Sequence, residues 1–157
     1  ILLRFPLIPS APYMEYDPAD IPVFIGGFMY GPIAGLIITV IVSFIQAITV
    51  SASSGWIGFV MHVIATGSFV IVASLIYKKI HTYKGAIISL IAGTITMTVI
   101  MIPANLIFTP MFGVPLETVK AGILTIIVPF NLLKAIINSV VTLLVYKPLS
   151  RILKDKF

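Results

Sequence analysis

Two long stretches of the chain contain no charged residue. From Ile21 to Tyr77, and again from Gly85 to Leu116, there is no Asp, Glu, Lys or Arg. About 20 apolar residues suffice to cross a bilayer as a helix, so these stretches hold several crossings. Runs such as Ile33–Ile45 also lack the alternation of a membrane β-strand. The sequence therefore predicts an all-α, polytopic integral membrane protein.

Composition and charge placement support this fold class. Only 10% of the residues are charged and 59% are hydrophobic, whereas a soluble domain needs about a quarter charged. The net charge is +5, but the basic residues gather in a turn at 78–84 and a tail at 147–157. Basic residues that border apolar spans mark the cytoplasmic side of a membrane. We therefore expect a lipid bilayer as the partner of this surface, and no nucleic acid.

The charges also predict how many times the chain crosses the membrane. The loop 10–20 holds three of the five acids and is expected outside, and the turn 78–84 is expected inside. An odd number of crossings must separate them. Ile57–Tyr77 is one crossing, so Ile21–Ser54 must hold two. Glycine and proline at Gly31-Pro32 indicate the break, which predicts a short helix near Asp20–Tyr30 and a longer one near Pro32–Thr49.

The remaining segments complete a six-helix prediction. Lys84–Phe108 leads outward to a loop at 109–120, and Ala121–Tyr146 returns to the basic tail. The apolar run Ile1–Ile8 is expected to be the end of a first helix whose start is missing. Residues 1–157 would then form a single membrane-embedded domain of six transmembrane helices, the first truncated, with both termini cytoplasmic. Gly27, Gly31 and Gly35 either allow close helix packing or serve only as bend glycines.

Groups suited to catalysis or metal binding are scarce. There is no cysteine and no phosphate-binding Gly-Lys-Ser/Thr loop. No acid lies inside a predicted span, and neither histidine is spaced with carboxylates as a metal ligand. Ser43 and Ser68 have no base nearby in sequence, and His62 is expected to be packed or hydrogen-bonded. We therefore expect a protein that is not an enzyme, with no metal and no cofactor.

Lys134 is the exception to the pattern, because it lies within the last predicted helix. An intramembrane ammonium is costly and suggests a functional site. Asn131 and Asn138 share its helix face, and Asn105 lies near the outer end of the preceding helix. One interpretation is a substrate-binding cluster for a compact polar or heteroaromatic solute. The other is that Lys134 extends to the interface while the asparagines join helices.

The outer loop offers side chains that suit a flat ring. Tyr13, Met14 and Tyr16 lie within the predicted loop 10–20 and would fold over an aromatic ligand. An ordinary interfacial loop explains them equally well.

The sequence resembles a known transporter family. Asp17-Pro18-Ala19-Asp20-Ile21-Pro22, followed by Gly26-Gly27-Phe28-Met29-Tyr30-Gly31-Pro32-Ile33-Ala34-Gly35, resembles the second and third helices of the substrate-binding (S) components of energy-coupling-factor (ECF) vitamin transporters. Asn131-Leu132-Leu133-Lys134 resembles their riboflavin-specific member. The resemblance extends from the end of the first helix onward.

The resemblance implies a six-helix protein of the bacterial cell membrane that binds riboflavin near its outer surface. It implies the first outer loop as a lid, and a transmembrane coupling (T) subunit with two ATPase subunits as partners. Riboflavin has ring carbonyls for Lys134 and the amides, and a flat ring for Tyr13, Met14 and Trp56.

Other functions remain open. The chain is alternatively an S component for thiamine or a folate, with Glu15 or Asp17 facing a cationic ligand. It is also alternatively a stand-alone secondary transporter.

Overall fold

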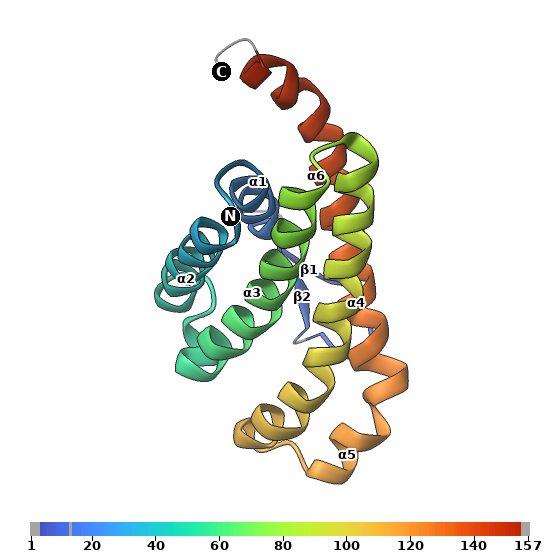
Figure 1. Ribbon diagram of the computed structural model, residues 1–157. Coiled ribbons are helices and arrows are strands. Elements are labelled where there is room, and N and C mark those ends of the chain that lie inside the picture. The colour runs from blue at the N-terminus through green and yellow to red at the C-terminus, as the bar shows by residue number, and fades with distance from the viewer. Residues whose placement is uncertain (1–3, 13, 155–157) are drawn as a thin grey trace.

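The computed structural model describes residues 4–12 and 14–154 as a bundle of helices with a small hairpin (Figure 1). The all-α membrane fold is confirmed. The strands are β1 (Phe5–Pro6) and β2 (Glu15–Tyr16), and the α-helices are α1 (Asp20–Tyr30), α2 (Pro32–Ile48), α3 (Gly55–Lys79), α4 (Tyr83–Phe108), α5 (Leu116–Ala121) and α6 (Val128–Lys154).

Within residues 4–12 and 14–154, three helical segments are long and apolar enough to span a bilayer. They cover Ala52–Lys79, Tyr83–Phe112 and Ile123–Arg151, each including short adjoining turns of other helix types. The predicted spans Ile57–Tyr77 and Lys84–Phe108 agree with α3 and α4 to within two residues at each end. Helices α1 and α2 are shorter apolar helices, as the predicted division of Ile21–Ser54 requires.

The glycines between α1 and α2 serve both as a bend and as a packing surface. Gly31 has a φ of 91°, which L side chains rarely adopt, and Pro32 then begins α2. A Cβ on Gly35 would lie 2.9 Å from the Cα of Gly27 and 2.8 Å from a methyl of Val70. The two short helices therefore approach each other and α3 closely because these positions lack side chains.

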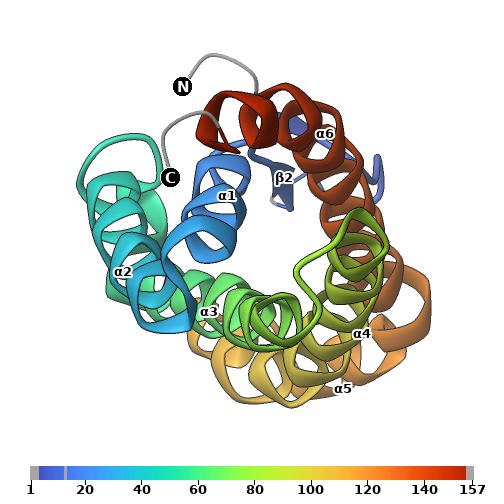
Figure 2. The ribbon, with the colours of Figure 1, turned by 45° about the horizontal axis from the view of Figure 1, so that its top comes forward.

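The start of the chain differs from its prediction. Residues 1–3 lie outside the described residues, and residues 4–8 are not helical, contrary to the expected end of a first helix. Phe5 pairs with Tyr16 and Pro6 with Glu15 in an antiparallel hairpin. Figure 2 shows β2 inside the ring of helices, between α1 and α6. An apolar run is ambiguous between strand and helix when it is this short, and contact with the bundle decides.

The segment between α4 and α6 contains more helix than the predicted loop 109–120. A 3₁₀ turn at Thr109–Phe112 and the short helix α5 form this connection, and a π-helical turn at Ile123–Ile127 precedes α6. The α-helix therefore begins at Val128, one residue before Pro129, and not at the predicted Ala121. Proline is favoured in the first turn of a helix, where its missing N–H is not needed.

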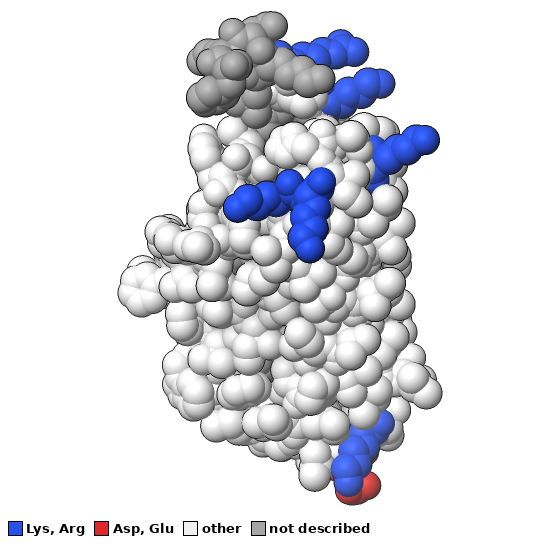
Figure 3. Space-filling view, in the orientation of Figure 1, with Lys and Arg blue, Asp and Glu red and all other residues white. Residues whose placement is uncertain are grey.

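Basic side chains gather at one end of the bundle, which we call the basic end. Lys and Arg appear there in Figure 3, around the α3–α4 turn and the end of α6, whereas Glu117 and Lys120 mark the opposite end. Near the basic end Tyr77 is buried, stacks on Phe28 and bonds through its hydroxyl to Tyr146. Tyr77 is therefore part of the core.

Candidate functional site

Lys134 forms a buried ion pair with Asp20. Its Nζ lies 3.1 Å from Asp20 Oδ2, and the exposed fractions of the two residues are 6% and 1%. Asp20 is the first residue of α1, whereas Lys134 lies on α6. The prediction that no acid lies inside a predicted span is therefore wrong for Asp20, which is buried at the start of α1. An isolated ammonium in hydrocarbon is costly, and a neighbouring carboxylate offsets that cost.

Asp20 accepts hydrogen bonds at both carboxylate oxygens. On Oδ1 it accepts from Thr66 Oγ1 at 2.9 Å and lies 3.0 Å from His62 Nε2. On Oδ2 it meets Lys134 and also accepts from Asn138 Nδ2 at 3.3 Å. Four side chains from α3 and α6 thus surround one carboxylate of α1. An ionised carboxylate has about four acceptor positions, so these contacts satisfy it.

Asn138 connects this ionic cluster to the hairpin. The hydroxyl of Tyr16 donates to Asn138 Oδ1 at 2.6 Å. The amide of Asn138 faces the Asp17 carbonyl as well, at 3.4 Å. Burial, together with the charges of Asp20 and Asp17, raises the pKa of Tyr16 above its ordinary value. The hydroxyl therefore stays protonated and remains a donor at neutral pH.

A second ionic cluster ties the hairpin to the α2–α3 connection. Arg4 Nη2 lies 2.6 Å from Asp17 Oδ2, and its Nη1 donates to Ser51 Oγ at 2.8 Å. Gln46 Nε2 also donates to Asp17 Oδ2, at 2.6 Å. Glu15 lies 3.8 Å from the same arginine. Two of the three acids of the predicted loop 10–20 are thus paired with Arg4, and one of them, Asp17, also bonds to Gln46.

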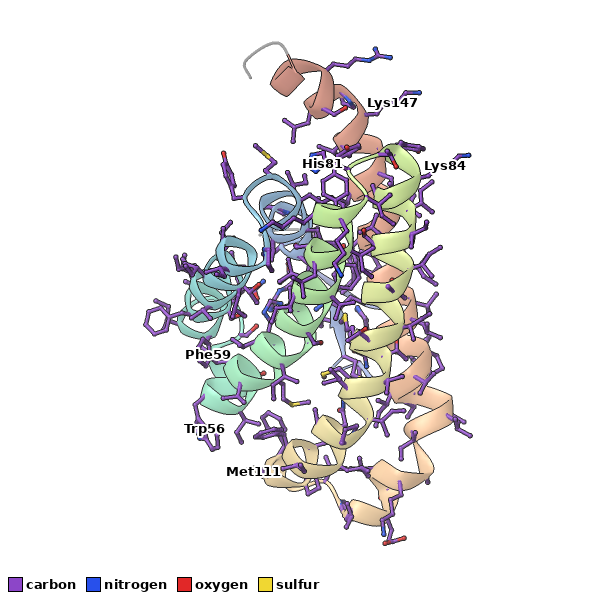
Figure 4. The ribbon with its side chains drawn as sticks, viewed as in Figure 1. Trp56, Phe59, His81, Lys84, Met111 and Lys147 are labelled. Carbon is purple, nitrogen blue, oxygen red and sulfur yellow. The ribbon has the colours of Figure 1, made fainter. Side chains whose placement is uncertain are left out.

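A polar cavity of about 360 Å³ lies between these two clusters, beside the start of α3. Its volume falls within the roughly 300–1,000 Å³ of small-molecule sites. Phe59, labelled in Figure 4, adds apolar surface. The charged and amide or imidazole side chains on its wall are Arg4, Glu15, Asp17, Gln46, His62 and Lys134.

A larger cavity of about 720 Å³ lies at the basic end. Its wall is mostly aromatic and apolar, and His81 and Lys147, labelled in Figure 4, are among its polar members. The buried carboxylate–ammonium pair lies beside the smaller cavity, so we assign the candidate site to that one.

The three asparagines predicted to bind a ligand have different surroundings in the structure. Asn138 joins the Asp20 cluster, as described above. Asn131 Nδ2 donates to the Ile127 carbonyl, and Asn105 Nδ2 donates to the Met101 carbonyl, each one turn back in its own helix. Both are buried, and neither is on the wall of the polar cavity. Lys134, for which Asn105 was the predicted neighbour, contacts Asp20 instead.

Among the described residues, the side chains predicted to contact the flat ring of a ligand also have different surroundings. Tyr16 is buried against Asn138, and Met14 is half-buried in the hairpin. Trp56 is 61% exposed at the start of α3 and points away from the bundle (Figure 4). Tyr13 lies outside the described residues.

A chain of polar contacts joins Ser43, His62 and Asp20, which lie far apart in the sequence. Ser43 Oγ lies 2.6 Å from His62 Nδ1, so this serine does have a base as neighbour. The same hydroxyl also donates to the Thr39 carbonyl at 2.6 Å. Ser43 lies inside α2, and its hydrogen bond to His62 Nδ1 fixes the orientation of the histidine ring.

Asp20, His62, Arg4 and Gln46 are site residues that the sequence analysis does not identify. The signal was the position of Asp20, directly before the apolar run that begins at Ile21. A lone acid at the start of one membrane helix and a lone lysine inside another are natural partners. Among the described residues, no group of three His, Cys, Asp or Glu side chains is placed to hold a metal.

Comparisons with known proteins agree on one family. The sequence profile of the ECF transporter substrate-specific component matches residues 1–146. The chain is 30% identical to the riboflavin transporter FmnP of Bacillus subtilis (93% of this chain, 82% of the relative). It is 32% identical to the riboflavin transporter RibU of Streptococcus thermophilus (98% and 77%).

One solved structure has the same fold. It is described as the S component of a bacterial ECF transporter, and it superposes with a TM-score of 0.83. The sequence identity is 30%, and the match covers 98% of this chain and 88% of that one.

Proposed function

This chain belongs to the substrate-specific components of ECF transporters, and on that premise we propose that it binds riboflavin as the cargo of an uptake transporter. Relatives named riboflavin transporters match it over most of both lengths, at about 30% identity. The observation that carries the proposal is a cavity of ligand size with a buried, fixed lysine on its wall.

The chemistry of the polar cavity supports an uncharged, hydrogen-bonding ligand. Lys134 has three donors, and the contact with Asp20 occupies one. The others are available to the carbonyl oxygens of the riboflavin ring. Gln46 and Ser43 offer partners for the hydroxyls of its sugar-alcohol chain. The contacts of Asn131, Asn105, Asn138, Tyr13, Met14, Tyr16 and Trp56 stay predictions from the sequence, since those of them that the structure describes are not on the wall of this cavity.

The charges favour riboflavin over a cationic vitamin such as thiamine. A cation would need a carboxylate free to pair with it. Asp17 is already bonded to Arg4 and Gln46, and Glu15 lies near the same arginine. Binding a cation would break those contacts and leave Arg4 without its partner.

The proposed partners follow from the family. A transmembrane coupling subunit and two ATPase subunits would supply the energy, because the chain has no nucleotide-binding motif of its own. The protein would lie in a bacterial cell membrane with its basic end in the cytoplasm. The hairpin would then act as the lid of the site from the outer half of the bundle.

The absorption spectrum of the protein purified from its host membrane tests the function. Bound riboflavin gives a yellow protein with flavin bands, in about one equivalent per chain. A colourless protein that also fails to quench the fluorescence of added riboflavin would overturn the proposal. Colourless protein that instead retains thiamine or a folate would assign another vitamin.

A further inference from the structure

Asp20 accepts hydrogen bonds at both carboxylate oxygens, yet it is not on the wall of the polar cavity. Its carboxylate lies behind Lys134, and four side chains contact it from two other helices. We propose that Asp20 is a positioning residue, which holds the Lys134 ammonium at the cavity wall so that its remaining donors face the ligand. This inference rests on the proposed riboflavin function.

The first argument is conformational. A lysine side chain is long and flexible, and ordering it on binding costs rotamer entropy. The contact between Lys134 Nζ and Asp20 Oδ2 orders it before any ligand arrives. Preorganisation of this kind raises affinity because the ligand does not have to order the lysine.

The second argument concerns the carboxylate itself. Thr66 and Asn138 donate to opposite oxygens of Asp20, and His62 faces the oxygen that Thr66 contacts. The carboxylate therefore cannot rotate without breaking several hydrogen bonds. The ring of His62 is fixed in turn by Ser43, through Nδ1. A rigid anion gives the lysine one position along the wall.

The third argument is energetic. A buried ion pair is often no more stabilising than apolar side chains of similar volume. The pair between α1 and α6 is therefore poorly explained by stability alone. One member of the pair, Lys134, is on the wall of the polar cavity, and this location favours a role in binding.

A double-mutant cycle tests the proposal by riboflavin binding to purified protein in detergent. The variants are Asp20→Asn, Lys134→Met and both together, and flavin fluorescence quenching gives each dissociation constant. We expect about 10- to 100-fold weaker binding for Lys134→Met, and about tenfold for Asp20→Asn. Asp20→Asn should add almost nothing when Lys134 is already methionine, because it acts through the lysine.

The double variant and a milder single variant, Thr66→Val, show whether an effect on binding arises from misfolding. The double variant contains no unpaired buried charge, so it should fold with a thermal midpoint near that of the parent. Thr66→Val keeps both charges and removes one donor to Asp20, and it should weaken riboflavin binding a few-fold. Glu117→Gln is the control, since this exposed acid pairs only with Lys120 at the end opposite the basic end.

The outcomes separate the two proposals. A parent protein that does not bind riboflavin contradicts the proposed function. A parent that binds, together with Asp20→Asn at parental affinity, contradicts the positioning role. So does an Asp20→Asn effect of the same fold in both lysine backgrounds, because a general structural defect is additive. The visible band of bound flavin gives a second readout, and in Asp20→Asn it should shift toward its position in Lys134→Met.

Discussion

The Tyr16 hydroxyl lies 2.6 Å from Asn138 Oδ1, which joins the hairpin to α6 across 122 residues of sequence. Asn138 also contacts Asp20, so the hairpin and the Lys134 ion pair share one hydrogen-bonded network. We expect Tyr16→Phe to lower the free energy of unfolding by about 1 kcal/mol and to speed riboflavin release several-fold. Thermal unfolding and stopped-flow dissociation measure both. Tyr83→Phe, at a half-exposed tyrosine of the basic end, is the matched control.

Removing the ammonium of Lys134 should reduce riboflavin affinity more than any other single change at the wall. A hydrogen bond to a charged group contributes about 1.5–3 kcal/mol, which is about 10- to 100-fold in affinity. Lys134→Ala and Asn131→Ala, measured by fluorescence quenching, compare the cavity lysine with a buried amide of the same helix. Unchanged affinity in both variants would remove this region as the binding site.

Gly35→Ala should destabilise the junction of α1, α2 and α3. Its new methyl would lie 2.9 Å from the Gly27 backbone and 2.8 Å from Val70. Overpacking of this kind costs about 1–3 kcal/mol. We expect a lower thermal midpoint, whereas Gly122→Ala, whose methyl would meet its neighbours at 3.4 Å or more, should change it little. Equal effects of the two substitutions would contradict the close approach.

Arg4→Gln should loosen the hairpin without unfolding the bundle. The arginine bonds to Asp17 and to Ser51, so its loss frees the hairpin from the α2–α3 connection. Hydrogen exchange of the backbone amides at 14–17 should become faster, while the amides of α4 stay protected. Lys120→Gln breaks only an exposed pair and serves as the control. Parental exchange at 14–17 would show that Arg4 does not anchor this segment.

Cysteine labelling tests the orientation in the membrane. The chain has no cysteine of its own, so a single introduced thiol reports one position. In intact cells, a membrane-impermeant maleimide should label Thr118→Cys at the end opposite the basic end. Lys84→Cys, in the basic turn, should react only after the cells are opened. The reverse pattern would contradict the proposed sidedness.

Much of the bundle was predictable because membrane helices obey a one-dimensional rule. Uncharged stretches of the required length locate α3 and α4, and Gly31-Pro32 locates the break before α2. The start of α6 was less predictable, since the turn at Ile123–Ile127 has a π-helical pattern that apolar composition does not distinguish. The short run at Phe5–Pro6 is a strand and not the predicted helix, because it pairs with Glu15–Tyr16, and hydropathy along the chain does not report pairing between separate segments.

The candidate site was likewise predictable only in part. The sequence alone determined that the protein resides in a membrane and at which residues its helices break. It also determined that Lys134 is anomalous, because the cost of a charge in hydrocarbon depends on its position along the chain. Only the tertiary structure decided that Asp20 faces this lysine while Asn105 and Asn131 bond within their own helices. Hydropathy specifies how deep a residue lies, whereas partner choice depends on helix rotation and packing. Those are set by contacts between segments far apart in sequence.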